Sequence, residues 1–169
     1  MKIVGIVGRK NSGKTHLVVR LIGEFRRRGL SVSTVKHTHH HDVELDSPGK
    51  DSFRHREAGA REVIIASDRR WYLMHAAEDE TPPSLCALIG RLAPCDLVLV
   101  EGYKGLASHP RLEVFRASVA GDVAPLAADD PGILAVACPR DAVPAHWPGT
   151  VARLDLDDTA GIADFLIAT

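Results

Sequence analysis

The stretch GRKNSGKT, from Gly8 to Thr15, determines how the rest of this sequence is interpreted. It matches the pattern G-x-x-x-x-G-K-[ST] at every specified position, and it separates the apolar run KIVGIV from a helical pattern that begins at Lys14. A strand before the pattern and a helix after it are the context in which it binds phosphate groups. The glycines let successive backbone N–H groups turn towards phosphate oxygens, and the positive end of the helix adds to their attraction. The sequence therefore predicts a nucleotide site at this loop.

Two side chains of the loop have predicted roles of their own. Lys14 is expected to bridge the β- and γ-phosphates, and the Thr15 hydroxyl is expected to ligate Mg²⁺. A second metal contact usually comes from a carboxylate at the end of another buried strand, and Glu101 in DLVLVEG meets that description. The predicted nucleotide-binding residues of the loop are Gly8, Arg9, Lys10, Asn11, Ser12, Gly13, Lys14, Thr15 and His16.

Apolar periodicity predicts an α/β fold around this loop. From Lys14 to Arg28, apolar residues recur at three- and four-residue spacing and Gly29 follows as a stop, which indicates an amphipathic helix. Continuous apolar runs such as DLVLV are typical of parallel strands buried on both faces. The stretches REVIIASDRRWYLMHA and PRLEVFR instead indicate shorter, antiparallel strands. We therefore expect a P-loop NTPase type of fold: a mainly parallel sheet flanked by helices, with additional antiparallel strands.

The predicted elements cover most of the chain, and we expect a single domain over residues 1–169. Further helices are expected at Pro82–Leu92 and Thr159–Ala168, and the turn sequence PGKDS predicts another after Pro48. The predicted strands are Lys2–Val7, Leu30–Val35, Glu62–Ala66, Trp71–His75, Asp96–Val100, Arg111–Arg116 and Ile133–Ala137.

Composition argues against nucleic-acid and membrane partners. The sequence has 21 Lys and Arg against 22 Asp and Glu, so no overall field attracts polyanions. The N-terminal apolar run is broken by glycines and is far shorter than the roughly 20 residues that span a bilayer. The hydrophobic content of 45% is enough for a packed core. We therefore expect a cytoplasmic protein.

The residue that reads the base has no standard motif to mark it. The N-K-x-D sequence that usually recognises guanine is absent. Asp141 follows the strand pattern ILAVAC, in a place where it could accept hydrogen bonds from a guanine edge. An aspartate in a loop also commonly caps or solvates a turn, so both interpretations of Asp141 stay open.

A histidine-rich segment follows the second predicted strand. Clustered imidazoles and carboxylates can bind zinc or nickel, but these have no diagnostic ligand spacing. Alternatively, Lys36, His37 and Lys50 contact phosphates of a substrate or partner, and Asp51 assists Mg²⁺. A solvated loop without a specific role is a third interpretation. The PGKDS turn favours the second, because free N–H groups at a helix start can meet an anion. The segment contains His37, His39, His40, His41, Asp42, Glu44, Asp46, Lys50, Asp51 and His55.

Several blocks together carry a family resemblance. GRKNSGKT, KHTHHH, PGKDSFRHREAGA, DLVLVEGYK and PRLEVFR occur in this order, and PGKDS followed by AGA and VEGYK is the specific part. The sequence resembles the molybdopterin-guanine dinucleotide biosynthesis protein B family. This resemblance implies a dimeric, weakly hydrolysing P-loop protein that binds GTP with Mg²⁺. It also implies an adaptor for the molybdenum cofactor guanylyltransferase, which attaches GMP to molybdopterin to form the guanine dinucleotide.

Two other functions share the phosphate-binding loop. A small-molecule kinase usually needs an arginine-bearing lid, and neither Arg26–Arg28 nor Arg69–Arg70 resembles one. A nickel-insertion GTPase would explain the histidines, but the sequence has no closely spaced cysteine pair in a loop. A water-positioning residue is not identifiable, and Arg9, Arg54 and Arg56 are alternative arginines that could act on the phosphates in cis or across a dimer.

Overall fold

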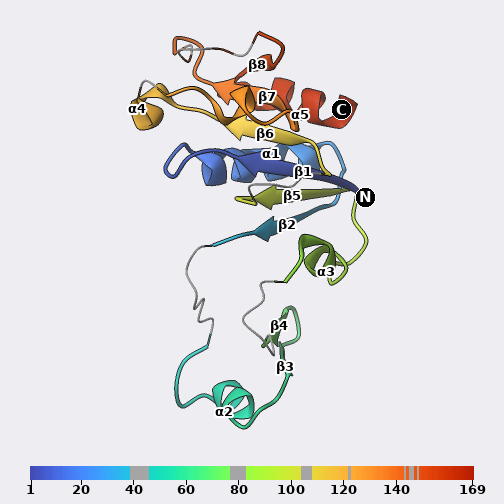
Figure 1. Cartoon of the computed structure of the whole chain (residues 1–169). Coiled ribbons are helices and arrows are strands. Elements are labelled where there is room, and N and C mark those ends of the chain that lie inside the picture. Colours follow the sequence, from blue (N-terminus) through green and yellow to red (C-terminus); the bar gives the residue numbers. More distant parts are fainter. Residues whose placement is uncertain are drawn as a thin grey trace. The chain divides into compact units, whose positions relative to one another are not determined.

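The structure is a computed structural model in which two compact units are described separately (Figure 1). The first unit comprises Met1–Thr38 and Leu92–Thr169, and the second comprises His39–Arg91. The prediction of a single domain stays a prediction. The structure describes residues 1–38, 46–76, 83–103, 108–121, 123–142, 144, 147 and 149–169.

The first unit is built on a six-stranded sheet with the order β2-β5-β1-β6-β7-β8. Figure 1 shows the strands stacked in this order, with β2 and β8 at the two edges. Every pairing between neighbours is parallel, so the carboxyl ends of all the strands lie along one edge of the sheet. The strands are β1 (Lys2–Val7), β2 (Val32–Lys36), β5 (Leu97–Glu101), β6 (Arg111–Val114), β7 (Ile133–Cys138) and β8 (Ala152–Asp155).

Both faces of this sheet are covered, as continuous apolar strands require. On one face, α1 (Lys14–Arg27) and α5 (Thr159–Ala168) pack against each other and bury Leu17, Phe25 and Ile162 in the main core. On the other face, a smaller core contains residues of β1 and β7, Phe115 directly after β6, and the 3₁₀ helix η1 (Leu126–Ala128). The short helix α4 (Ala117–Ala120) follows β6. The α/β fold predicted from the sequence is therefore confirmed.

One strand prediction is wrong in its direction. We expected PRLEVFR to form an antiparallel addition, but β6 pairs in parallel with β1 and with β7. Its polar residues misled the prediction, because both Arg111 and Glu113 are buried and have internal partners. β6 is thus a central strand, next to the strand that leads into the phosphate-binding loop.

The second unit contains an antiparallel pair of strands, as predicted. β3 (Glu62–Ala66) pairs with β4 (Trp71–His75), with Ile64 opposite Leu73.

Two helices of the second unit can be compared with the predictions. α2 (Asp51–Glu57) confirms the helix expected after PGKDS. α3 (Leu85–Ile89) is shorter than the predicted Pro82–Leu92, because Ser84 caps it by accepting a hydrogen bond from the Ala87 N–H and it ends at Gly90. Pro83 therefore precedes the helix and is not in its first turn, and Pro82 lies outside the described residues.

A buried carboxylate joins β6 to the smaller core. Glu113 is 0% exposed, and its two oxygens accept hydrogen bonds from the backbone N–H groups of Leu126 and Ala127, both at 3.0 Å. Burial raises the pKa of the Glu113 carboxyl above its ordinary value of 4.5, although these N–H groups and the charge of Arg9 act in the opposite direction. Loss of hydration therefore outweighs the favourable contacts of the charged form.

The raised pKa of Glu113 predicts a pH-dependent stability. Because the folded protein holds this proton more tightly than the unfolded chain, the contribution of Glu113 is fully present below pH 4.5 and is lost as the pH rises through the raised pKa. Glu113→Gln cannot ionise. The unfolding free energy of this variant, relative to wild type, should therefore rise with pH, by about 1.4 kcal/mol for each unit by which the folded pKa exceeds the ordinary one.

Urea unfolding at pH 4 and pH 7 measures this difference. Glu57→Gln is the matched control, because Glu57 is exposed at the end of α2. A difference between Glu113→Gln and wild type that stays constant with pH would mean that the Glu113 carboxyl titrates alike in folded and unfolded chains.

Candidate nucleotide-binding site

The predicted phosphate-binding loop connects β1 to α1 and needs glycine at both ends. Gly8 and Gly13 have φ angles of +145° and +97°, and Asn11 also has a positive φ of +63°. A Cβ atom on Gly8 would collide with the carbonyl oxygen of Val114 on β6 and lie 2.9 Å from Ser12 Oγ. The loop therefore depends on glycine for its backbone conformation and for its close approach to β6.

Polar groups converge inside this loop. The Lys14 ammonium donates to the carbonyl oxygens of Gly8, at 3.1 Å, and Arg9, at 2.6 Å, so its side chain folds back over the loop. Ser12 is 2% exposed, and its hydroxyl has no hydrogen-bond partner in the part of the chain that the structure describes. A buried hydroxyl without a partner is costly, and a phosphate oxygen would satisfy it. The donor set of the loop therefore fits a polyphosphate.

The two predicted magnesium ligands of the first unit contact each other. The Thr15 hydroxyl donates to Glu101 Oε1 at 2.6 Å. Glu101 ends β5 and lies in register with Ile6 of β1 on one side and Lys36 of β2 on the other. The ammonium of Lys36 lies 3.3 Å from Thr15 Oγ1 and 3.5 Å from Glu101 Oε1. A hydroxyl and a carboxylate at this position are suitable oxygen ligands for Mg²⁺, and Lys36 supplies a positive charge beside them.

His37 lies next to the same strand end. Its backbone N–H donates to the Glu101 carbonyl oxygen at 2.9 Å, and its ring meets the edge of the Tyr103 ring, with 4.8 Å between centroids. Gly102, between Glu101 and Tyr103, has a φ of +88°, which lets the chain turn after β5. Burial raises the pKa of Tyr103. His37 and Lys36 are therefore adjacent to the predicted metal ligands.

Two arginines border the loop, and the sequence predicted only one of them. Arg9 has a buried Nε without a hydrogen-bond partner among the described residues, and its charge acts on the carboxyl of Glu113. Arg116 was not predicted; its Nε donates to the Ser12 carbonyl oxygen at 3.2 Å. The only sequence signal for Arg116 is its position two residues after the end of β6, which is informative once β6 is known to lie beside β1.

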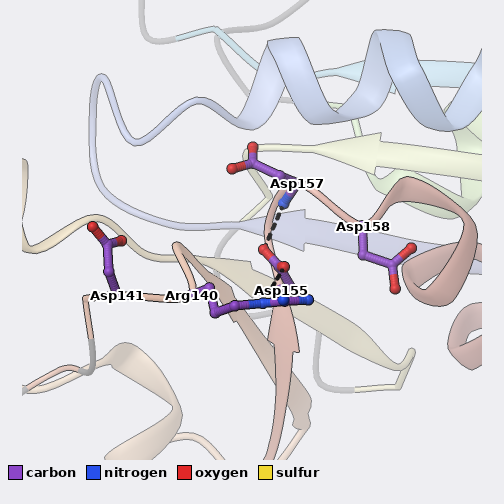
Figure 2. Close-up of a pocket in the computed structure, with 5 residues that line it drawn as sticks. All are labelled: Arg140, Asp141, Asp155, Asp157 and Asp158. Atoms are coloured by element: carbon purple, nitrogen blue, oxygen red, sulfur yellow. Dashed lines mark hydrogen bonds and ion pairs between the residues drawn. The ribbon is translucent and has the colours of Figure 1, made fainter.

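Asp141 lines an open pocket at the same edge of the sheet, with a volume of about 560 Å³. Figure 2 shows Asp141 on the segment after β7, and three other aspartates on the segment at the end of β8. Asp155 is held by Arg140 Nε, at 3.1 Å, and by the backbone N–H of Asp157, at 3.0 Å. Asp158 caps α5. The sequence predicted only Asp141 among the lining residues, which are Arg140, Asp141, Asp155, Asp157 and Asp158.

Lys50 and Asp51 belong to the second unit. Lys50 occupies the N-cap position of α2 without a side-chain capping bond, and Asp51 is the first residue of the helix. Asp51 lines an open pocket with Arg54 and His55. Their predicted roles beside the nucleotide stay predictions, as do those of Arg54 and Arg56. The consecutive histidines 39–41 lie outside the described residues.

Neither a clustered metal site nor a membrane-spanning helix is present among the described residues. Within those residues, no group of three or more His, Cys, Asp or Glu side chains is arranged to hold a metal ion. No helix in the same part of the chain has the length and apolar character needed to cross a membrane.

Known proteins resemble this chain over most of its length. The sequence pattern of the family described as "Molybdopterin guanine dinucleotide synthesis protein B" matches residues 3–139. A molybdopterin-guanine dinucleotide biosynthesis adapter protein of Escherichia coli is 39% identical over 158 residues, which are 92% of this chain and 86% of that protein. Its counterpart in Haemophilus influenzae is 38% identical over 168 residues, which are 97% of this chain and 86% of the relative.

Solved structures agree with these sequence matches. A crystal structure of molybdopterin-guanine biosynthesis protein B superimposes with a TM-score of 0.71 at 28% identity, covering 98% of this chain and 97% of the other. A homologue from Bacillus stearothermophilus gives a TM-score of 0.68 at 25% identity, with 99% and 97% coverage. The sequence pattern, the relatives and the fold all agree, and the chain belongs to the molybdopterin guanine dinucleotide synthesis protein B family.

Proposed function

We propose that this protein is a GTP-binding adapter in the biosynthesis of molybdopterin guanine dinucleotide. In this role it works in the cytoplasm and assists the guanylyltransferase that attaches GMP to molybdopterin. Family membership supports the pathway, since the relatives in E. coli and H. influenzae are named as adapter proteins of this biosynthesis. The observation that carries the nucleotide part is the loop itself, with its folded-back Lys14 and its buried, unpartnered Ser12 hydroxyl.

In the proposed complex, phosphate oxygens replace the contacts that the loop makes with itself. Lys14 leaves the carbonyl oxygens of Gly8 and Arg9 and pairs with the β- and γ-phosphates. The Ser12 hydroxyl donates to a phosphate oxygen and gains the partner that it lacks among the described residues. These exchanges favour binding because hydrogen bonds to charged phosphate oxygens replace hydrogen bonds to neutral carbonyl oxygens.

Thr15 and Glu101 would hold the magnesium ion. When bound, Mg²⁺ neutralises charge on the β- and γ-phosphates. The 2.6 Å hydrogen bond between Thr15 and Glu101 already brings the two oxygens to one place, so they need little rearrangement to act together. Lys36 lies close enough to exchange its contacts with this pair for contacts with a phosphate oxygen. Asp51 lies in the second unit, and its predicted contact with the metal ion stays a prediction.

Asp141 is the proposed reader of the guanine edge. It follows β7 at the carboxyl edge of the sheet, where open α/β sheets bind ligands. The part of the chain that the structure describes gives the Asp141 side chain no hydrogen bond or ion pair, whereas Asp155 and Asp158 are engaged. A carboxylate without a partner can accept hydrogen bonds from the N1–H and 2-amino groups of guanine. Adenine has neither of these two donors.

Hydrolysis is expected to be weak, in keeping with an adapter. The sequence marks no water-positioning group, and such a group normally contributes strongly to phosphoryl transfer. The kinase and nickel-insertion alternatives gain no support from any observation on the described residues.

We also propose that the protein is a homodimer. Direct pairing of Ile64 with Leu73 and of Ala66 with Trp71 places these four apolar side chains on one face of the β3–β4 pair. Ile64 and Trp71 are 63% and 64% exposed, which is unusual for large apolar residues that stand together. A second copy of this chain would cover this face.

Replacing Lys14 should remove most GTP binding without unfolding the protein. Lys14→Ala deletes a charge that serves the phosphates, so GTP affinity should fall about ten- to hundredfold in isothermal titration calorimetry. The variant should also fail to stimulate GMP transfer by the guanylyltransferase. Lys2→Ala is the control, because Lys2 lies at the opposite end of β1 and donates to the Ile167 carbonyl oxygen. A folded Lys14→Ala protein with wild-type GTP affinity would refute the proposal.

Glu101→Gln should separate metal binding from nucleotide binding. Glutamine still accepts the Thr15 hydrogen bond but lacks the negative charge that attracts Mg²⁺. GTP affinity in EDTA should change little, while the increase on adding Mg²⁺ should shrink severalfold in the same calorimetric titration. If Mg²⁺ strengthens binding to the variant as much as to wild type, Glu101 is not a metal ligand.

Light scattering should give about twice the chain mass of 18.3 kDa. Trp71→Ser should shift the equilibrium towards the monomer, because it removes the largest apolar side chain from the proposed interface. Val19→Ser should not, since Val19 is comparably exposed, at 61%, but lies on α1. A single-chain mass across a wide concentration range for the wild type would contradict the dimer.

A further inference from the structure

The pairing of β6 with β1 brings Arg116 to the phosphate-binding loop. Val7, the last residue of β1, is in register with Glu113. From Glu113 onwards, β6 runs beside the phosphate-binding loop, so that the Val114 carbonyl oxygen faces Gly8. Arg116 lies two residues further on and reaches the other end of the loop, at Ser12 and Gly13.

Arg116 is held tightly against the loop backbone. Its Nε donates to the Ser12 carbonyl oxygen at 3.2 Å, and a Cβ atom on Gly13 would lie in van der Waals contact with the same nitrogen, at 3.4 Å. The side chain of Arg116 is half-buried, so it is partly withdrawn from water.

The charge of Arg116 has no carboxylate partner in the described part of the chain. The Ser12 bond is the one interaction of the Arg116 side chain there, and it uses one of the five N–H donors of a guanidinium. Two other arginines of this unit have carboxylate partners: Arg111 pairs with Asp130 at 2.7 Å, and Arg140 pairs with Asp155 at 3.1 Å. Arg20 and Arg153 donate to backbone carbonyl oxygens, but neither contacts the phosphate-binding loop in these bonds. Arg116 is therefore a half-buried cation beside a phosphate-binding loop, and its remaining N–H donors are suited to binding an anion.

We propose that Arg116 is a phosphate-binding residue of the nucleotide site and that it contacts the α-phosphate side of the bound nucleotide. This inference rests on the proposed function of the loop as a GTP site. In it, the Nε contact with Ser12 orients the guanidinium, and the remaining N–H groups donate to phosphate oxygens.

The sheet order supports the α-phosphate side. β5 and β6 flank β1 on opposite sides, so the Thr15–Glu101 pair and Arg116 approach the loop from opposite sides. The metal ion serves the β- and γ-phosphates, and the lysine of such loops reaches the same two groups. The α-phosphate is therefore the phosphate left for a cation on the β6 side. Both GTP and GDP carry this phosphate, next to the nucleoside.

A purely structural role would make Arg116 a brace for the loop, and two variants separate the alternatives. Arg116→Lys keeps the charge but lacks the Nε–H group. Arg116→Gln keeps an N–H donor for the Ser12 carbonyl oxygen but loses the charge. A phosphate-binding role therefore requires Arg116→Gln to be the weaker binder, and a brace requires the opposite order.

Calorimetric titration of wild type and variants with GTP and with GDP tests this proposal. Arg116→Gln should lower the affinities for GTP and for GDP by about tenfold or more, and by the same factor for both. Arg116→Lys should lower these affinities less. Arg27→Ala, which removes the same charge from an exposed position at the far end of α1, should bind like wild type. Thermal unfolding of each variant should show that it is folded.

Three results would overturn the assignment of Arg116. They are wild-type affinity of Arg116→Gln for both nucleotides, weaker binding by Arg116→Lys than by Arg116→Gln, and a loss confined to GTP. A wild-type protein that binds neither GTP nor GDP would instead overturn the proposed function of the loop, and with it this inference.

Discussion

The parallel pairing of β1 with β5 on one side and β6 on the other is the constraint on which the candidate site depends. Parallel strands bring their carboxyl ends to one edge, so the residues that follow three separate strands meet around one loop. Glu101 reaches Thr15 from β5, and Arg116 reaches Ser12 after β6. Without this pairing, the loop would retain its glycines and Lys14 but lose both flanking side chains.

Close packing gives this arrangement its rigidity. Gly8 lies so near the carbonyl oxygen of Val114 that a methyl group cannot be inserted, so the start of the loop is fixed against β6. The same strand carries Glu113, whose buried carboxylate holds the N–H groups of η1 and experiences the charge of Arg9. β6 therefore links the loop to the smaller core through both its backbone and its side chains.

Positive side chains gather around the loop, and they differ in the partners that the structure gives them. Lys36 has Glu101, and Arg9 acts on Glu113. Lys14 is held by carbonyl oxygens, which are weaker partners than a phosphate, and Arg116 also contacts a carbonyl oxygen. Such a gathering of cationic donors favours the binding of a polyphosphate, because partly desolvated cations gain most from an anion with several oxygens.

The sequence by itself determined the loop, the strand and helix on either side of it, and the candidates Thr15 and Glu101, because these depend on local residue patterns. It misjudged β6, since Arg111 and Glu113 resemble the polar face of an exposed strand until their buried partners are known. It missed β8 and Arg116 for a related reason: neither has a local pattern that reveals its neighbours. Only the tertiary structure decided which strands lie beside β1, because strand order depends on long-range packing between segments far apart in the chain.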